Sequence, residues 1–168
     1  MKNIVYILIA MIALVGCQKK PTNSATNSKG QQVSRQLIAR SLKDLENKNL
    51  KGAVESLEAA IKASPSEPEA YLLMGQILLK VGEYNQAALF LDQAAKVHPN
   101  NGTIFYMLSV AHRMLGNKLL AVLSAKRSVE IFQAAEDKDN FLKSAVLLQD
   151  LINMPDPASK ENATEGNL

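Results

Sequence analysis

Cys17 is the only thiol in this 168-residue chain, and it directly follows a long apolar run. A single cysteine cannot form an internal disulfide, so it does not indicate the redox compartment of the protein. Two roles remain, a buried structural residue or a point of covalent attachment. Because Cys17 lies outside any plausible core, the sequence favours attachment.

The two histidines are the other side chains that could carry chemistry. His98 precedes Pro99 in a predicted loop, and His112 falls on a predicted helix. Neither has a cysteine or a second histidine at ligand spacing, so no metal site is predicted. No nucleophile elbow or glycine-rich phosphate loop is present. We therefore predict that the protein is not an enzyme and takes neither a cofactor nor a small-molecule substrate. The carboxylate pairs are predicted to be solvated helix ends: Asp44 with Glu46, and Asp137 with Asp139.

Composition and charge narrow the class of protein. Hydrophobic residues make up 47% of the chain, aromatic residues 5%, and there is no tryptophan. Alanine, leucine, lysine and glutamine are common, which favours helix. The 19 basic and 16 acidic residues give a net charge of +3 and are intermixed along the chain. A nucleic-acid partner is not predicted, because such a surface needs clustered basic residues.

Residues 1–17 are typical of a targeting segment. Lys2 supplies a positive charge, and the uncharged apolar run Ile4–Val15 follows it. As a helix this run would extend about 18 Å, whereas the hydrocarbon of a bilayer is about 30 Å thick. A secretory signal peptide over residues 1–16 is therefore favoured over an uncleaved membrane anchor.

The end of this segment resembles a bacterial lipobox. Leu14, Val15, Gly16 and Cys17 fit its pattern of leucine, a small or apolar residue, glycine or alanine, and cysteine. The resemblance implies that the Cys17 sulfur carries diacylglycerol and that the signal is cut before it, which would anchor the chain in a membrane. Two or more acyl chains hold a protein stably. Gln18, in place of aspartate, implies the periplasmic face of the outer membrane.

Polar segments flank the predicted domain. Residues 17–33 carry the predicted lipidated cysteine and then few apolar side chains, so they cannot bury enough surface to offset chain entropy. We predict a disordered tether there, which as a flexible coil would span about 20 Å. Residues 155–168 are also polar and are predicted to be a disordered tail.

The body of the chain repeats every 34 residues. Ala53, Ala87 and Ala121 share one column of the repeat, and Pro65 and Pro99 share another. Small residues recur where two helices approach closely, and glycines and prolines separate the helical stretches. Further columns agree: Ser41, Gly75 and Ser109; Leu57, Leu91 and Ala125; Ala60, Ala94 and Ser128; and Gly82 with Gly116.

Residues 70–99 are similar to a tetratricopeptide repeat (TPR). Tyr71, Gly75, Ala87, Ala94 and Pro99 occupy positions of the family pattern. The resemblance implies an all-α TPR solenoid of helix-turn-helix units in three repeats, 34–67, 68–101 and 102–135. Helices are expected near 34–46, 51–63, 68–80, 85–97, 102–114 and 119–134. A seventh helix, 138–153, has an apolar stripe and is predicted to cap the TPR domain, 34–154.

In TPR proteins the first helix of each pair lines a concave groove. By resemblance, a protein partner would bind at the corresponding positions here. The family's carboxylate clamp needs lysine and asparagine where this chain has Ile38 and Leu42, so that mode of binding is not expected. Leu123, on a second helix, is expected to be core. The candidate groove residues are Ile38, Leu42, Leu72, Gln76, Leu79, Tyr106, Val110 and Arg113, within a wider set that adds Arg35, Leu45, Glu69 and Thr103.

Two functions fit these features. The first is a lipid-anchored TPR scaffold that helps to assemble a cell-envelope complex, as small lipoproteins called pilotins do for the secretin ring of type IV pili. The alternative is an accessory subunit that recruits or regulates a peptidoglycan-active envelope enzyme. In both, the protein acts through protein partners.

Overall fold

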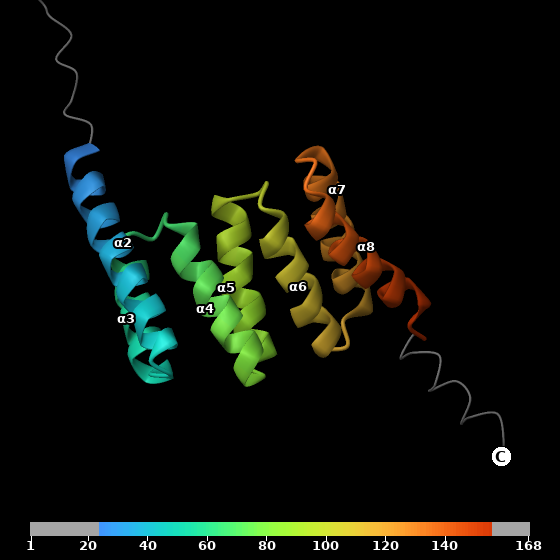
Figure 1. Ribbon diagram of the computed structural model, residues 1–168, viewed down its shortest axis with the longest axis horizontal. Coiled ribbons are helices and arrows are strands. Elements are labelled where there is room, and N and C mark those ends of the chain that lie inside the picture. The colour runs from blue at the N-terminus through green and yellow to red at the C-terminus, as the bar shows by residue number, and fades with distance from the viewer. Residues whose placement is uncertain (1–23, 156–168) are drawn as a thin grey trace, which may run out of the picture.

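The computed structural model describes residues 24–155, and all their regular secondary structure is helical (Figure 1). The predicted signal peptide, Cys17 and the tail from residue 156 lie outside the described residues. The seven helices of the described part are α2 (Ser24–Glu46), α3 (Leu50–Ala63), α4 (Pro68–Val81), α5 (Tyr84–Val97), α6 (Gly102–Met114), α7 (Lys118–Ala134) and α8 (Lys138–Asn153).

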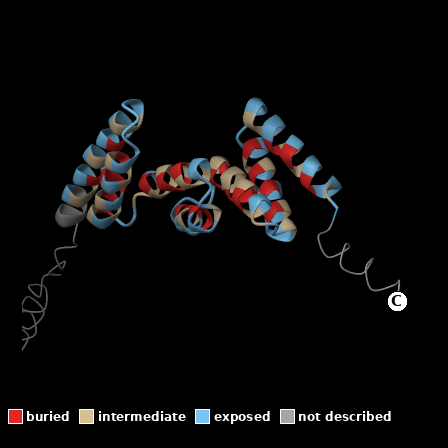
Figure 2. Ribbon diagram, turned by 90° about the horizontal axis from the view of Figure 1, so that it is seen from below, coloured by how far each residue is buried: buried red, intermediate tan, exposed pale blue. Residues whose placement is uncertain are grey.

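The helices form pairs that stand side by side in a row. Helices α2 and α3, α4 and α5, and α6 and α7 pack against each other, and α8 packs against α7 (Figure 1). The first helices of successive pairs, α2, α4 and α6, also contact one another in turn, and α8 contacts α6. The buried residues lie where helices meet (Figure 2). This arrangement confirms the predicted all-α solenoid of helix pairs with an additional last helix.

The predicted boundary of the tether is wrong within the described residues. Helix α2 begins at Ser24, so residues 24–33 are helical and were assigned to a disordered segment. A Cβ atom on Gly30 would lie 2.5 Å from the carbonyl oxygen of Ala63, so this part of α2 packs tightly beside the end of α3. Ser34 is fully buried. The contact depends on glycine and serine, which the apolar pattern does not detect.

Turn residues explain why most of the predicted helix ends are correct. Gly82 and Gly116 have φ angles of 85° and 74°, the left-handed region that glycine adopts without steric cost. Lys48 fills the same place in the first pair with a φ of 58°. A non-glycine residue there costs about 1 kcal/mol. The side chain of Asn101 caps α6 by accepting from the backbone N–H of Thr103 at 3.0 Å.

The small residues of the repeat columns lie in the core, where helices approach closely. Ala53, Ala87 and Ala121 are all fully buried. A Cβ atom on Gly75 would lie 2.6 Å from Cγ of Leu91, so the column with glycine at this position lets α4 and α5 approach closely. The 34-residue register is therefore set by packing between helices.

The prediction that Leu123 is a core residue is also wrong. It is 54% exposed, whereas the residues of α7 that are buried are Ala121, Ala125, Ser128 and Phe132. Leu119 and Leu123 share a helix face that is nearly opposite to the face of the alanines, because each residue advances about 100° around a helix. Both stripes have helical spacing, and the sequence pattern alone did not show which one faces the core.

Two polar contacts hold the ends of α8. The side chain of Asp137 accepts hydrogen bonds from the side-chain amide of Asn140 at 2.8 Å and from its backbone N–H at 3.1 Å. These bonds lower the pKa of Asp137 below its usual value. The ionised Asp137 therefore stabilises the folded state at pH values above the pKa that it has in the unfolded chain. This stabilisation is lost as the pH falls through the lower pKa that Asp137 has in the folded chain. At the other end, Lys118 Nζ donates to the carbonyl oxygens of Ile152 and Met154.

Lys118→Met is expected to loosen the last turn of α8 while leaving the other helices in place. The substitution removes the donor to two terminal carbonyls and a positive charge beside a helix C-terminus, which together cost about 0.5–1 kcal/mol. Hydrogen exchange should report faster exchange of the backbone amides of Ile152 and Asn153. Lys126→Met is the matched control, because Lys126 has no hydrogen-bond or ion-pair partner among the described residues. Equal protection in both variants would contradict the capping role.

Candidate protein-binding groove

The inner face of the row consists of α2, α4 and α6, the first helices of the three pairs. We call this face the inner groove. It is defined by the predicted groove residues on these helices, without Ile38. Leu72, Gln76 and Leu79 are part-buried on α4, and Tyr106 and Val110 are part-buried on α6. Leu42 on α2 and Arg113 on α6 are exposed.

The apolar members of the inner groove lie on the rim of the core. Leu72 and Leu79 pack beside a buried cluster formed by α5 and α6, which includes Leu91 and Leu108. Tyr106 and Val110 pack beside a different cluster, formed by α7 and α8. Each of these four side chains is thus held on one side by the core and keeps some accessible surface. Such positions are rigid and can still contact a partner.

Ile38 does not belong to the inner groove. It is 3% exposed and lies in a core cluster with Leu57 of α3 and Met74 of α4. The repeat register places Ile38 and Leu72 at the same position, but α2 presents Ile38 to α3 and α4, whereas Leu72 keeps accessible surface. The predicted binding role of Ile38 is therefore wrong, and the residue stabilises the first two pairs.

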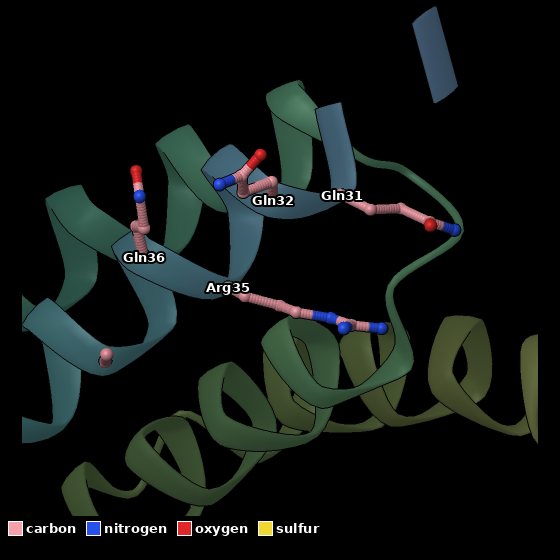
Figure 3. A pocket seen from close by; sticks show the side chains of 5 residues that line it. Gln31, Gln32, Arg35 and Gln36 are labelled. Carbon is pink, nitrogen blue, oxygen red and sulfur yellow. The ribbon is translucent and has the colours of Figure 1, made fainter. Parts of the chain in front are cut away.

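A polar hollow that the sequence did not predict lies along α2. Its volume is about 460 Å³, and Gln31, Gln32, Arg35, Gln36 and Ala39 line it (Figure 3). Figure 3 shows Arg35 extending toward the loop before α4, where its Nε lies 3.9 Å from Oε2 of Glu67. The glutamines at 31 and 32 had been assigned to the tether. Gln31, Gln32, Arg35 and Gln36 have the spacing of one helix face. This spacing would indicate the polar face if the helix were predicted to begin before residue 34.

Tyr106 also borders a second, smaller hollow between α6 and α8. The space is about 50 Å³ and is lined by Thr103, Phe132, Asn140, Lys143 and Ser144 as well. At its edge, Ser128 donates to the carbonyl of Gly102 at 2.8 Å and accepts from Ser144 at 2.9 Å. Tyr106 therefore links the inner groove to the packing of the last helix.

The two histidines lie near the ends of α5 and α6. Within residues 24–155, no three histidine, cysteine or acidic side chains are placed to hold a metal ion. His98 lies exposed at the end of α5, and His112 is part-buried on α6. None of the helices in the described part is both long enough and apolar enough to cross a membrane. The inner groove and the two hollows are accessible on the described residues.

A row of helix pairs in which each pair contacts its neighbours defines an α-solenoid, an architecture of stacked repeats. Residues 44–111 match the tetratricopeptide repeat family. The TPR domain of Arabidopsis OM64 superposes with a TM-score of 0.64 and 16% identity, over 73% of this chain and 96% of that one. A complex of the TPR2B domain of yeast Sti1 with pHsp70 gives a TM-score of 0.66 and 12% identity, over 71% of this chain and 96% of the other. The described domain is a TPR solenoid.

Two mouse proteins match in sequence over part of their length. The Fanconi anemia group G protein homolog is 31% identical over 91 residues, which is 54% of this chain and 14% of that protein. Tetratricopeptide repeat protein 33 is 28% identical over 101 residues, 60% of this chain and 38% of that protein. The chain thus spans well under half the length of either relative. The similarity supports the presence of the repeats.

Proposed function

We propose that this protein is a lipid-anchored scaffold that binds a protein partner in its inner groove and helps to assemble a cell-envelope complex. The observation that carries the proposal is the row of part-buried apolar side chains on α4 and α6. Apolar side chains that gather on one face and keep accessible surface favour a partner-binding site there. The TPR2B domain of Sti1, which has a similar fold, forms a complex with a protein partner.

The partner should be an extended or helical segment with apolar side chains. Leu72, Leu79 and Val110 offer apolar contact, Tyr106 adds a hydroxyl group, and Arg113 is an exposed positive charge at the end of α6. Aromatic residues and arginine are enriched among residues that dominate binding energy. An acidic group beside the apolar segment would complement Arg113.

The placement in the cell rests on the sequence. The lipobox-like Leu14–Cys17 supports a lipid anchor, and Gln18 supports the periplasmic face of the outer membrane. A scaffold there would hold one component of an envelope machine, for example a secretin ring of a pilus system, near the membrane. The anchor at Cys17 can be tested separately from binding in the inner groove.

Tyr106→Ala is expected to weaken capture of the partner by about ten- to a hundredfold, because loss of a central aromatic contact costs about 1–3 kcal/mol. The measurement is affinity purification from detergent-extracted membranes, with each partner band normalised to folded protein. Leu89→Ala is the matched control, because Leu89 is an exposed apolar residue on α5, outside the groove.

Tyr106 also contacts the cluster of α7 and α8, so some loss of stability is expected. Gln76→Ala separates the two effects, because Gln76 is part-buried in the groove and belongs to none of the three core clusters of the described part. It should lower capture with little change in melting temperature. If both variants capture the partner as well as Leu89→Ala does, the inner groove is not the binding surface.

A further inference from the structure

Helix α8 is the first member of a pair whose second member is absent from the described structure. It begins 36 residues after α6, and the capping residues Asn101 and Asp137 have the same spacing. Tyr106 and Val110 of α6 are part-buried beside the cluster of α7 and α8. Their counterparts on α8 are Leu142 and Val146, which are 59% and 62% exposed. On α6, the helices that follow in the chain cover the face with Tyr106 and Val110. On α8, no helix of the described residues covers the corresponding face with Leu142 and Val146.

The exposed apolar side chains of α8 form a surface that we call the end face, defined by Leu142, Val146 and Ile152. Ile152 is 55% exposed. Among the described helices, α8 contacts only α7 and α6 and stands at the end of the row (Figure 1). Terminal repeats of solenoids normally need a polar outer surface to remain soluble. The end face departs from that rule.

The opposite end of the row carries several charged and polar side chains. On α2 the exposed side chains include Gln32, Gln36 and Arg40, and on α3 they include Lys51 and Glu55. These charged and polar side chains lie beside the exposed Val33 and Leu50, and head-to-tail stacking of copies would bury the charged groups against the end face. A contact of the end face with itself is closed and two-fold symmetric, the commonest symmetry of oligomers.

The residues that follow α8 in the sequence are mostly polar. Between residues 156 and 168 the only apolar side chains are Ala158, Ala163 and Leu168, and Pro157 interrupts the segment. The second helices of the three complete pairs bury several apolar residues each, for example Ala88 and Leu91 on α5. A second copy of α8 presents the same apolar side chains, Leu142 and Val146, and could cover this face.

We propose that the end face is a homodimer interface in which α8 packs antiparallel to α8 of a second copy. We place the two-fold axis between Val146 and Leu147. Each residue of α8 then lies opposite the residue of the second copy that is equally far along the helix on the other side of the axis. Lys143 then lies opposite Asp150 of the second copy, and both are exposed on α8. The positive and negative charges thus complement each other twice across the axis.

The same register fills an apolar cleft. Phe141 lies opposite Ile152 of the second copy. Phe141 lines an open cleft of about 340 Å³ at the turn between α7 and α8, together with Phe132, Gln133, Glu136, Asp137 and Lys138. This cleft can receive the branched side chain of isoleucine. Lys118 holds the backbone of Ile152, so the side chain is presented from an ordered turn.

The dimer should be weak in solution. One pair of helices buries less than the roughly 1,600 Å² of a standard interface, which places the dissociation constant at about the micromolar level or above. Crosslinking in membranes of cells that express the full chain is therefore a better test than chromatography. The chain has a single natural cysteine, Cys17, so new thiols can be placed one at a time.

Val146→Cys places a thiol beside the proposed two-fold axis. The same thiol of the second copy would then lie next to it. Mild oxidation should produce a disulfide-linked dimer that reduction removes. Leu89→Cys, on α5, is the matched control because Leu89 is 66% exposed and lies away from the end face. The unchanged chain controls for Cys17. A dimer from Val146→Cys alone supports the proposal. No dimer, or equal dimer from Leu89→Cys or the unchanged chain, would overturn it.

Charge reversal tests the register. In the Val146→Cys background, Lys143→Asp or Asp150→Lys should each lower the crosslinked fraction by about two- to fivefold, the effect of a partly exposed ion pair. The double reversal should restore it. Failure of the double variant to recover would overturn the antiparallel pairing. None of these residues belongs to the inner groove, so the outcome is independent of partner capture.

Discussion

Ala87→Arg is expected to unfold the domain or to lower its melting temperature by about 10 °C or more. Ala87 is 0% exposed, in the column of alanines that separates the helices of each pair. An arginine there overpacks the contact and buries a charge without a partner, which together cost about 4 kcal/mol or more. Domains of this size have net stabilities of only about 5–15 kcal/mol.

Leu89→Arg is the control for this prediction. It makes a similar change two residues away on the same helix, at a side chain that is exposed. Its helix propensity is close to that of leucine, so its effect should stay within about 0.5 kcal/mol. Thermal unfolding followed by circular dichroism distinguishes the two variants. Equal melting temperatures would show that the 34-residue register does not describe the packing.

The helices could be predicted because their ends are marked in the sequence. Helix α4 was expected at 68–80 and spans Pro68–Val81, and α8 was expected at 138–153 and spans those residues. Pro68 starts a helix where its missing N–H costs nothing, and Gly82 ends one in the left-handed conformation. These are local effects, so they do not depend on knowing the rest of the fold.

Rotation of the helices about their own axes could not be predicted in the same way. Ile38 and Leu42 both fit a groove pattern, but the first is buried and the second is exposed. Leu119 and Leu123 follow helical spacing as well as the buried alanines of α7 do. Which stripe faces the core depends on the neighbouring helices. Small residues add to the difficulty, because Gly30 and Ser34 make close contacts without a hydrophobic signal.

The inner groove and the end face also differ in what the sequence showed. The groove was predicted from a family resemblance, and seven of its eight main residues keep accessible surface on α2, α4 and α6. The apolar stripe of α8 was expected to cap the solenoid. The structure shows that one side of this stripe packs on α7 through Leu147 and Leu151, while Leu142 and Val146 point away from that contact. One helix thus covers the solenoid and leaves a new apolar surface.

Cys17→Ser is expected to abolish incorporation of radiolabelled palmitate into the protein. The prediction rests on the lipobox-like residues Leu14–Cys17, and Cys17 is the only side chain in the sequence that such a lipid could join through sulfur. In the unchanged chain the label should resist neutral hydroxylamine, which cleaves thioesters but not a thioether-linked diacylglycerol. The serine variant should also shift from the membrane fraction if its signal peptide is removed, or keep residues 1–16 if it is not.

The matched control moves the thiol while keeping its number constant. A chain with both Cys17→Ser and Ser28→Cys has one cysteine, placed outside the Leu14–Cys17 motif. It should remain unlabelled, because the resemblance assigns lipidation to the motif and not to any available thiol. Equal labelling of the unchanged chain and Cys17→Ser would contradict the anchor at this residue. Labelling of the moved cysteine would show acylation of a thiol outside the motif, and the scaffold would then need a different account of how it reaches the membrane.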